Sequence, residues 1–155
     1  MKKISFIAVF LLAVVCFFSC RSNKPSVQSP TLDEGVCAVL GFQYGTNVTA
    51  GEAKDIADAF RVNFHPSKYK VTGDNRGNGN KKMTKQQMCE VGRSLGAKYV
   101  VVGTINKLMD EYSVDVQVVN VLKETTVAFE GNAFQKPDCS KEMEKIAKRL
   151  ASKIE

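Results

Sequence analysis

Apolar residues recur with two different spacings along positions 32–155, and the spacing switches several times. Residues 36–42 (VCAVLGF) form a continuous apolar run, which is typical of a strand covered on both faces. The next segment instead has apolar residues at the spacing of one helix face: Ala53, Ile56, Ala57, Phe60 and Phe64. A buried strand followed by an amphipathic helix predicts an α/β fold.

Further strands follow in the sequence. Residues 69–72 predict a short second strand, which leads into the Gly- and Asn-rich loop 73–80. Residues 98–105 (KYVVVGTI) predict a third, buried strand. Apolar and polar residues alternate over 112–119, which predicts a half-exposed fourth strand, and 125–134 predict a fifth.

Helices are predicted after the first, second and fifth strands, and the first two helices begin with capping-box spacing. Thr49 precedes Glu52 by three residues, and Thr84 precedes Gln87 by three. Gly96 is placed to end the second helix. The C-terminal helix has its apolar residues on one face, at Met143, Ile146, Ala147, Leu150 and Ile154. The predicted element order is therefore βαβαβββα.

The connections between these elements determine the expected sheet. Two βαβ crossovers make the first three strands parallel neighbours, because such units are right-handed and join adjacent strands. Short turns near 107–110 and at 123–124 add the fourth and fifth strands as antiparallel neighbours. We therefore expect a single mixed five-stranded sheet in the order 2-1-3-4-5, with the helices packed on it.

The N-terminal segment has the organisation of an export signal. Lys2 and Lys3 precede the apolar residues 4–18, and Ser19 supplies the small residue that a signal peptidase needs before its scissile bond. The apolar stretch is shorter than the ~20 residues that an α-helix needs to cross a bilayer. A cleaved signal peptide is therefore favoured over a retained membrane span.

Residues 17–20 (FFSC) resemble a bacterial lipobox, in which Cys20 is acylated and becomes the new N-terminus. Phe17 and Phe18 depart from the usual Leu and Ala or Ser, and the alternative is an ordinary signal peptide with a coincidental cysteine. The resemblance implies three acyl chains at Cys20, which would hold the mature protein on a membrane permanently.

On this basis the chain divides into a signal peptide (1–19), a Ser- and Pro-rich tether (20–31) and an α/β domain (32–155) that faces the periplasm. Arg21 occupies the position at which the enterobacterial inner-membrane retention signal has aspartate. We therefore expect an outer-membrane lipoprotein, on the periplasmic face rather than at the cell surface.

Composition argues against several classes of function. Removal of the signal peptide takes out two lysines and lowers the net charge from +6 to +4, and no basic cluster has aromatic neighbours, so we expect no nucleic acid partner. Cys37, Cys89 and Cys139 lack metal-ligand spacing, and we expect no metal. Either two of these cysteines form a disulfide, or Cys37 and Cys89 are buried as small apolar residues.

The densest basic cluster is formed by Arg76, Lys81 and Lys82, in the loop region 73–82. One hypothesis is that these side chains contact a partner protein or an anionic glycan. The alternative is a solvated loop without a contact role.

A second candidate site is the loop 45–49, where Thr46, Asn47 and Thr49 precede a helix N-terminus. The loop resembles the phosphate loop of a flavodoxin, in which hydroxyls and backbone N–H groups hold an anion. The alternative is a helix cap, which Thr49 with Glu52 already explains. Neither a nucleophile with its base nor a pair of acid and base carboxylates is evident, so we expect no enzyme activity and no cofactor.

The succession of segments also resembles a known superfamily. Its most specific parts are residues 95–105 (LGAKYVVVGTI) and 114–121 (VDVQVVNV), preceded by CAVLGF at 37–42 and by an EAxxIAxxF helix at 52–60. These are similar to lipoprotein activators of penicillin-binding proteins, the curli secretion lipoprotein and the N-terminal domain of the periplasmic translocation protein of the Tol system. The resemblance implies a non-enzymatic periplasmic module that works through protein contacts.

We therefore expect a lipid-anchored periplasmic adaptor of the bacterial cell envelope that contacts the membrane through its lipid and an envelope protein through its domain. One alternative is a small-ligand or flavin-type anion-binding domain that uses the loop 45–49. Another is a secretion-accessory lipoprotein of the curli type without its pore, because the chain has no spare alternating segment to build a membrane barrel.

Overall fold

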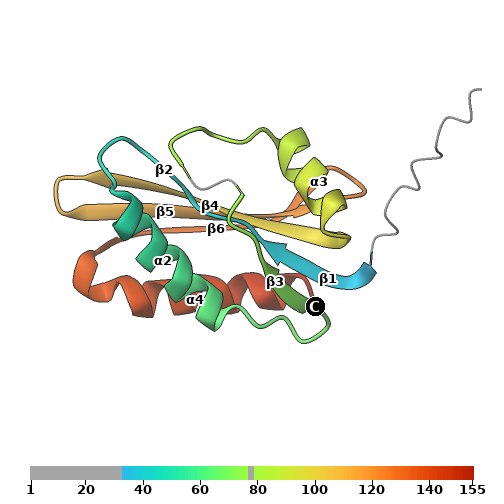
Figure 1. Cartoon of the computed structure of the whole chain (residues 1–155). Coiled ribbons are helices and arrows are strands. Elements are labelled where there is room, and N and C mark those ends of the chain that lie inside the picture. Colours follow the sequence, from blue (N-terminus) through green and yellow to red (C-terminus); the bar gives the residue numbers. More distant parts are fainter. Residues whose placement is uncertain (1–32, 77–78) are drawn as a thin grey trace, which may run out of the picture.

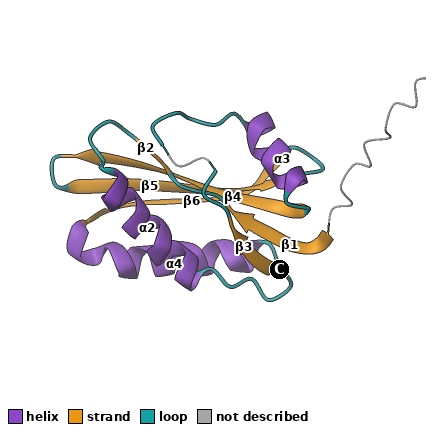
Figure 2. Ribbon diagram, viewed as in Figure 1, coloured by secondary structure: helices purple, strands orange, loops and turns teal. Residues whose placement is uncertain are grey.

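The computed structural model describes residues 33–76 and 79–155 (Figure 1). The predicted signal peptide, Cys20 and the tether lie outside these residues. The described part of the chain forms one mixed sheet with helices on both of its faces (Figure 2).

The predicted order of the sheet is confirmed. The strands lie in the order β3-β1-β4-β5-β6, which corresponds to the expected 2-1-3-4-5. β1 pairs in parallel with β3 and β4, whereas β4, β5 and β6 are antiparallel neighbours. The strands are β1 (Asp33–Val39), β3 (Lys70–Gly73), β4 (Ala97–Leu108), β5 (Glu111–Asn120) and β6 (Thr125–Gln135).

The sheet also contains a sixth strand, which the five-strand prediction missed. β2 (Gln43–Tyr44) pairs in parallel with residues 104–105 of β4. The predicted strand 36–42 ends at Val39, and the chain leaves the ladder before it returns as β2. A two-residue strand that directly follows an apolar run has no periodicity of its own, so the sequence pattern merges the two.

The three predicted helices are α2 (Ala50–Asn63), α3 (Lys85–Ser94) and α4 (Cys139–Lys153), and a 3-10 turn, η1 (Lys136–Asp138), precedes α4. α2 and α4 cover one face of the sheet, and α3 lies on the other (Figure 1). The connection from β1 to β3 runs toward one edge of the sheet, and the connection from β3 to β4 runs back toward the other edge. Right-handed crossovers in opposite directions place α2 and α3 on opposite faces.

Both predicted capping boxes are present. The Glu52 N–H donates to Thr49 Oγ1 at 3.2 Å and the Thr49 N–H donates to Glu52 Oε2 at 2.9 Å. The same exchange joins Thr84 and Gln87 at the start of α3. Gly96 follows α3 with a φ of 66°, a left-handed conformation that glycine adopts at low cost.

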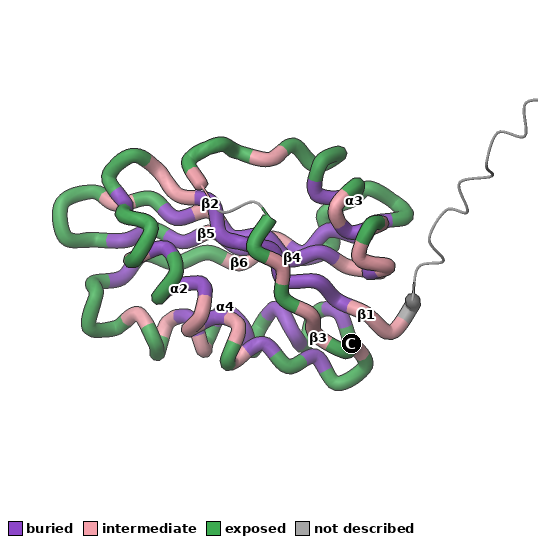
Figure 3. The backbone as a smooth tube through the Cα atoms, viewed as in Figure 1, coloured by how far each residue is buried: buried purple, intermediate pink, exposed green. Residues whose placement is uncertain are grey.

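The core has two parts, one on each face of the sheet (Figure 3). The larger part lies under α2 and α4 and includes Phe42, Phe60 and Phe64, with ring centroids 5.4 and 5.2 Å apart along the series. The smaller part lies under α3. A β-carbon at Gly103 would come within 2.3 Å of the Phe42 ring, so the close packing of β4 on this ring requires glycine.

The three cysteines of the domain are free thiols. Cys37 and Cys89 are fully buried, as expected for small apolar residues, and Cys139 is partly exposed at the start of α4. Burial raises the pKa of the Cys37 thiol to about 12, so this side chain is neutral at physiological pH.

The two ends of the sheet have different surroundings. Asp33, the first residue of β1, pairs with Ala97 at the start of β4, so the chain enters the sheet at this end. β4 runs to Leu108, and the β4–β5 turn lies at the opposite end of the sheet (Figure 1).

Candidate functional site

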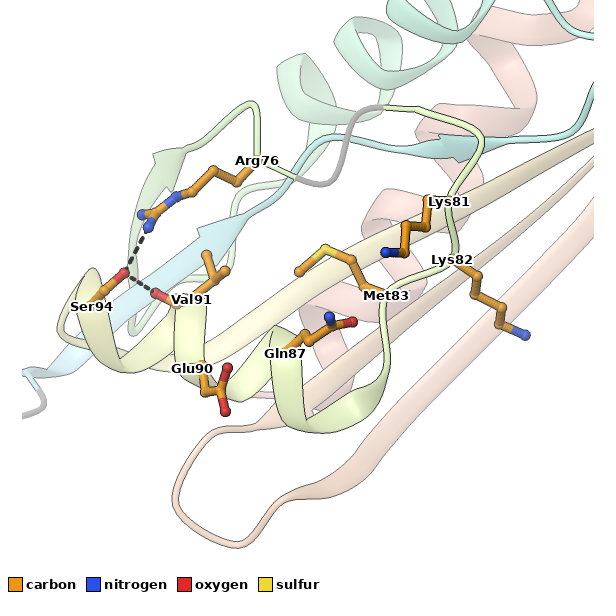
Figure 4. Close-up of a pocket in the computed structure, with 8 residues that line it drawn as sticks. All are labelled: Arg76, Lys81, Lys82, Met83, Gln87, Glu90, Val91 and Ser94. Atoms are coloured by element: carbon orange, nitrogen blue, oxygen red, sulfur yellow. Dashed lines mark hydrogen bonds between the residues drawn. The ribbon is translucent and has the colours of Figure 1, made fainter.

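The three cations of the predicted basic cluster line one groove between α3 and the chain that precedes it (Figure 4). We call this feature the cationic groove; its volume is about 510 Å³. Its lining residues are Arg76, Lys81, Lys82, Met83, Gln87, Glu90, Val91 and Ser94. The capping box at Thr84 fixes where α3 begins, and this places one face of the helix along the groove.

Arg76 is held in a fixed position at one end of the cationic groove. Its Nε donates to both carboxylate oxygens of Asp74 at 3.0 Å, and its Nη1 donates to Ser94 Oγ at 2.9 Å. The Ser94 hydroxyl in turn donates to the Val91 carbonyl at 2.7 Å. The hydrogen bond from Arg76 lowers the pKa of Asp74, so the two groups stay charged and paired at neutral pH.

Lys81 and Lys82 provide the unpaired positive charge of the groove. Both are exposed, and within residues 33–76 and 79–155 neither forms an ion pair or a side-chain hydrogen bond. Glu90 is the one carboxylate among the lining residues, and it accepts a hydrogen bond from Gln86 at 3.0 Å. The groove therefore combines a cationic rim with apolar contacts from Met83 and Val91.

Backbone hydrogen bonds attach the loop 73–82 to the sheet. The Asp74 N–H donates to Val39, the Gly41 N–H donates to Arg76, and the Tyr44 N–H donates to Gly79, at 3.0 to 3.2 Å. These bonds fix the described residues on each side of 77–78. The sequence predicted that Arg76, Lys81 and Lys82 belong together, and their role as a partner contact stays a prediction.

The second predicted site, the loop 45–49, precedes α2. Thr46 and Asn47 are exposed, and Thr49 is the N-cap of the helix. The Glu52 carboxylate accepts hydrogen bonds from both the Thr49 N–H and the Thr49 hydroxyl at 2.9 Å. A side chain of the protein thus uses two of the donors that an anion would use, which agrees with the cap alternative; anion binding by this loop stays a prediction.

Glu52 also belongs to a part-buried network that sequence reasoning missed. Lys107 Nζ lies 2.8 Å from Glu52 Oε1 and 4.8 Å from the centroid of the Tyr112 ring, and the Tyr112 hydroxyl donates to the same carboxylate oxygen. Hydrogen bonds from Lys107, Tyr112 and Thr49 hold the pKa of Glu52 well below its usual range.

Glu52 lies 55 residues before Lys107 and 60 residues before Tyr112 along the chain, so no spacing rule joins it to the other two. Lys107 and Tyr112 are cross-strand partners in the β4–β5 hairpin. This pairing was the one part of the network that the sequence could have indicated. The network fastens the turn end of the hairpin to the N-terminus of α2.

A smaller cavity of about 180 Å³ adjoins this network, between α2 and the start of α4. Its walls include Ile56, Tyr112, Phe134 and the partly exposed Cys139. Desolvation raises the pKa of the Cys139 thiol, which disfavours the nucleophilic thiolate. The Cys139 thiol is therefore less readily ionised than a solvent-exposed cysteine.

Across residues 33–76 and 79–155, no group of three or more His, Cys, Asp or Glu side chains is placed to hold a metal ion. No helix in the same residues is long and apolar enough to span a membrane.

The fold defines a class, that of small α/β domains whose mixed sheet begins with two parallel crossovers and ends in an antiparallel meander. No protein-family model matches the sequence, and no curated protein matches it. Solved structures do share the fold. TolB from Acinetobacter baumannii aligns with a TM-score of 0.55 at 14% sequence identity, over 82% of this chain and 30% of TolB.

This chain therefore spans less than a third of the length of TolB. A dodecameric point variant of PelC from Paraburkholderia phytofirmans aligns with a TM-score of 0.50 at 17% identity, over 76% of this chain and 86% of PelC. The LpoB C-terminal domain from Salmonella enterica has a TM-score of 0.48 at 14% identity, over 70% of this chain and 89% of that domain. The predicted superfamily resemblance is confirmed at the level of the fold.

Proposed function

We propose that the protein is a lipid-anchored adaptor of the bacterial cell envelope, which binds an acidic segment of an envelope protein through the cationic groove. One observation carries this proposal. Lys81 and Lys82 are exposed beside apolar contacts, and no carboxylate among the described residues pairs with them. Cations in this position attract an anionic partner, and a peptide segment with carboxylate and apolar side chains fits both the charge and the apolar contacts from Met83 and Val91.

The fixed geometry of Arg76 supports a role in positioning the partner. Because Asp74 and Ser94 already hold the guanidinium, the groove loses little side-chain entropy at this end when a partner binds. Lys81 and Lys82, by contrast, supply charge without a fixed direction. One hydrogen-bonded cation beside two exposed lysines favours a charged chain over a small ligand of defined shape.

The anchor supports the same function. If Cys20 carries the acyl chains, the tether 20–31 reaches at most ~40 Å when extended, so the domain meets partners close to its own membrane. We place the protein at the outer membrane, on the periplasmic face, and we assign it no enzymatic reaction. The fold that it shares with TolB supports the class of module and does not define its partner.

Charge reversal tests the groove. A photo-crosslinking residue in place of Glu90, which is exposed in the groove, should form an adduct with the partner in intact cells. Lys81→Glu with Lys82→Glu should lower the yield of this adduct at least about tenfold, because two attractive contacts become repulsive. Lys68→Glu with Lys70→Glu is the matched control, since these lysines are exposed outside the groove. Equal losses in the two double variants would refute the assignment of the groove.

Acyl labelling tests the anchor separately. Cells fed a labelled fatty acid should incorporate the label into the wild-type chain, and Cys20→Ala should abolish the incorporation. Cys37→Ala is the control because this cysteine is buried in the domain. Undiminished labelling of Cys20→Ala would show that the lipobox interpretation is wrong.

A further inference from the structure

The tip of the β4–β5 hairpin presents the two most exposed large apolar side chains among the described residues. Leu108 is 75% exposed and Met109 is 89% exposed. They are adjacent in the chain, at the end of β4 and in the turn that follows. Neither contributes to the core, so their apolar surface adds nothing to the stability of the isolated domain.

Met109 is also an unfavourable residue for the backbone at this turn. Its φ is 55°, in the left-handed region that side chains with a β-carbon disfavour. Glycine or asparagine would adopt this conformation more easily, and would expose less apolar surface. A methionine here therefore opposes both the turn geometry and the solubility of the fold, which points to a use outside the fold.

The hairpin holds the tip in a defined position. The β4–β5 ladder continues without interruption from Tyr99 to the closing pair of Leu108 with Glu111. Immediately below the tip, the Glu52–Lys107–Tyr112 network fastens both strands to α2. Leu108 and Met109 are thus presented by a rigid support, which lowers the entropy lost on binding.

Carboxylates surround these apolar side chains. Asp110 and Glu111 are exposed, and no ion pair with either forms within residues 33–76 and 79–155. The nearby Lys107 is already paired with Glu52. Lys136 lines one surface cavity together with Asp110, and its single positive charge offsets only part of the charge of the two carboxylates. An apolar tip with a net acidic rim complements an apolar recess with a basic rim, whereas the anionic surface of a bilayer would repel it.

The tip lies at the end of β4 opposite the point where the chain enters the domain (Figure 1). β4 has 12 residues, which corresponds to about 40 Å along the strand. We propose that Leu108 and Met109 dock into an apolar recess with a basic rim on an envelope protein, on the side of the domain away from the tether. This inference rests on the proposed adaptor function and adds a second contact, distinct from the cationic groove.

Photo-crosslinking from the tip tests the inference in cells that produce the full chain. A crosslinking residue at position 108 should give one protein adduct of defined mass. The same residue at Val62, which is 71% exposed on α2, should give none. Met109→Gly should lower the adduct from position 108 at least about tenfold, as expected for loss of a buried methionine contact. Thermal unfolding of this variant should occur at the same or a higher temperature, because the turn strain is relieved.

Charge variants provide an independent readout. Asp110→Lys with Glu111→Lys should lower the adduct from position 108 to a similar extent, and Lys145→Glu on α4 should leave it unchanged. Equal adducts from positions 108 and 62, an adduct with lipid alone, an adduct of two copies of this chain, or full yield from Met109→Gly would each overturn the inference. An adduct from position 90 in the groove without one from position 108 would overturn the tip contact and leave the adaptor function standing.

Discussion

At the scale of single residues, Glu52 connects more of the structure than any local pattern indicates. Its carboxylate accepts a hydrogen bond from the Thr49 N–H at the start of α2. It also accepts hydrogen bonds from the Lys107 and Tyr112 side chains of the β4–β5 hairpin. One side chain thus joins a helix N-terminus to the turn end of a hairpin. Removal of its charge should loosen both elements.

Glu52→Gln should lower the free energy of unfolding by about 1–2 kcal/mol at pH 7, because glutamine keeps the capping box but loses the charge-assisted bonds. The pKa of Glu52 is lower in the folded chain than its ordinary value of 4.5. Its contribution to stability is therefore complete above pH 4.5 and is lost as the pH falls toward the folded pKa.

Denaturant unfolding of wild type and variant at several pH values should show this dependence directly. The difference in stability should be constant from about pH 8 to 6 and should shrink between about pH 5 and 3. Glu144→Gln on α4, which removes an exposed pair with Lys148, should change stability by less than about 0.5 kcal/mol. A Glu52→Gln difference that grows on acidification would contradict the assigned network.

Substitution of two different glycines by alanine should change the stability of the fold in opposite directions. At Gly103 the added β-carbon would lie 2.3 Å from the Phe42 ring, so Gly103→Ala should destabilise the fold by about 1–3 kcal/mol. At Gly51, in the first turn of α2, nothing lies within 4 Å, and Gly51→Ala should stabilise by about 0.5 kcal/mol. Thermal unfolding of the two variants should shift in opposite directions; a shared direction would mean that the packing at Gly103 is misjudged.

At the scale of secondary-structure elements, local signals were sufficient for most of the fold. The capping boxes at Thr49 and Thr84 and the left-handed Gly96 are encoded within four residues, and the structure contains all three. Right-handed crossovers then fixed the sheet order. The sequence pattern did not predict β2, because a strand of two residues is too short to show a periodicity. It did not predict the Glu52 network, because the members of this network meet only in the tertiary fold.

The candidate site was also predictable only where its residues are close together in the sequence. Arg76, Lys81 and Lys82 are close in sequence, so their common location followed from the chain itself. The Asp74 and Ser94 partners of Arg76 depend on where the loop meets the end of α3. The exposure of Leu108 and Met109 depends on which face of the hairpin the helices leave uncovered, and alternation alone does not settle this.

β6 is an edge strand of the sheet, and two side chains protect its backbone. Lys153 of α4 donates to the Phe129 carbonyl at 3.4 Å, and the Asn132 side chain accepts from the Ala133 N–H at 3.0 Å. Unpaired edges of this kind invite pairing with another chain. Phe129 itself is 57% exposed, which would add apolar contact to such pairing.

Lys153→Ala with Asn132→Ala should therefore increase self-association of the purified protein. Sedimentation velocity should show dimers or larger species for the double variant at concentrations where the wild type is monomeric. Lys148→Ala is the control, because this lysine lies on α4 and pairs with Glu144 rather than with a residue of β6. Identical sedimentation of the double variant and the wild type would show that these side chains do not protect the edge.

At the scale of the whole molecule, the cationic groove and the hairpin tip occupy separate parts of the domain surface. The chain enters the sheet at one end of β4, and the β4–β5 turn lies at the other. The groove lies beside α3, on the face opposite α2 and α4. Separate cationic and apolar surfaces would suit the proposed adaptor, which holds its partner near a membrane.

Lipid anchoring should strengthen such a contact without changing the groove. If Cys20 is acylated as proposed, a tether of about a dozen residues would confine the domain to a thin layer and give it a high effective concentration toward partners in the same layer. A released domain would be diluted through the whole compartment. The yield of the groove contact in cells should therefore depend on Cys20, although Cys20 is not part of the groove.

The central claim, a membrane-tethered protein contact, is tested most directly by one measurement: the yield of the position-90 crosslink in cells, with and without Cys20→Ala, at matched protein levels. We predict a defined protein adduct in the chain with Cys20 and a yield at least about tenfold lower in Cys20→Ala. Equal yields, or no protein adduct from either chain, would contradict the account.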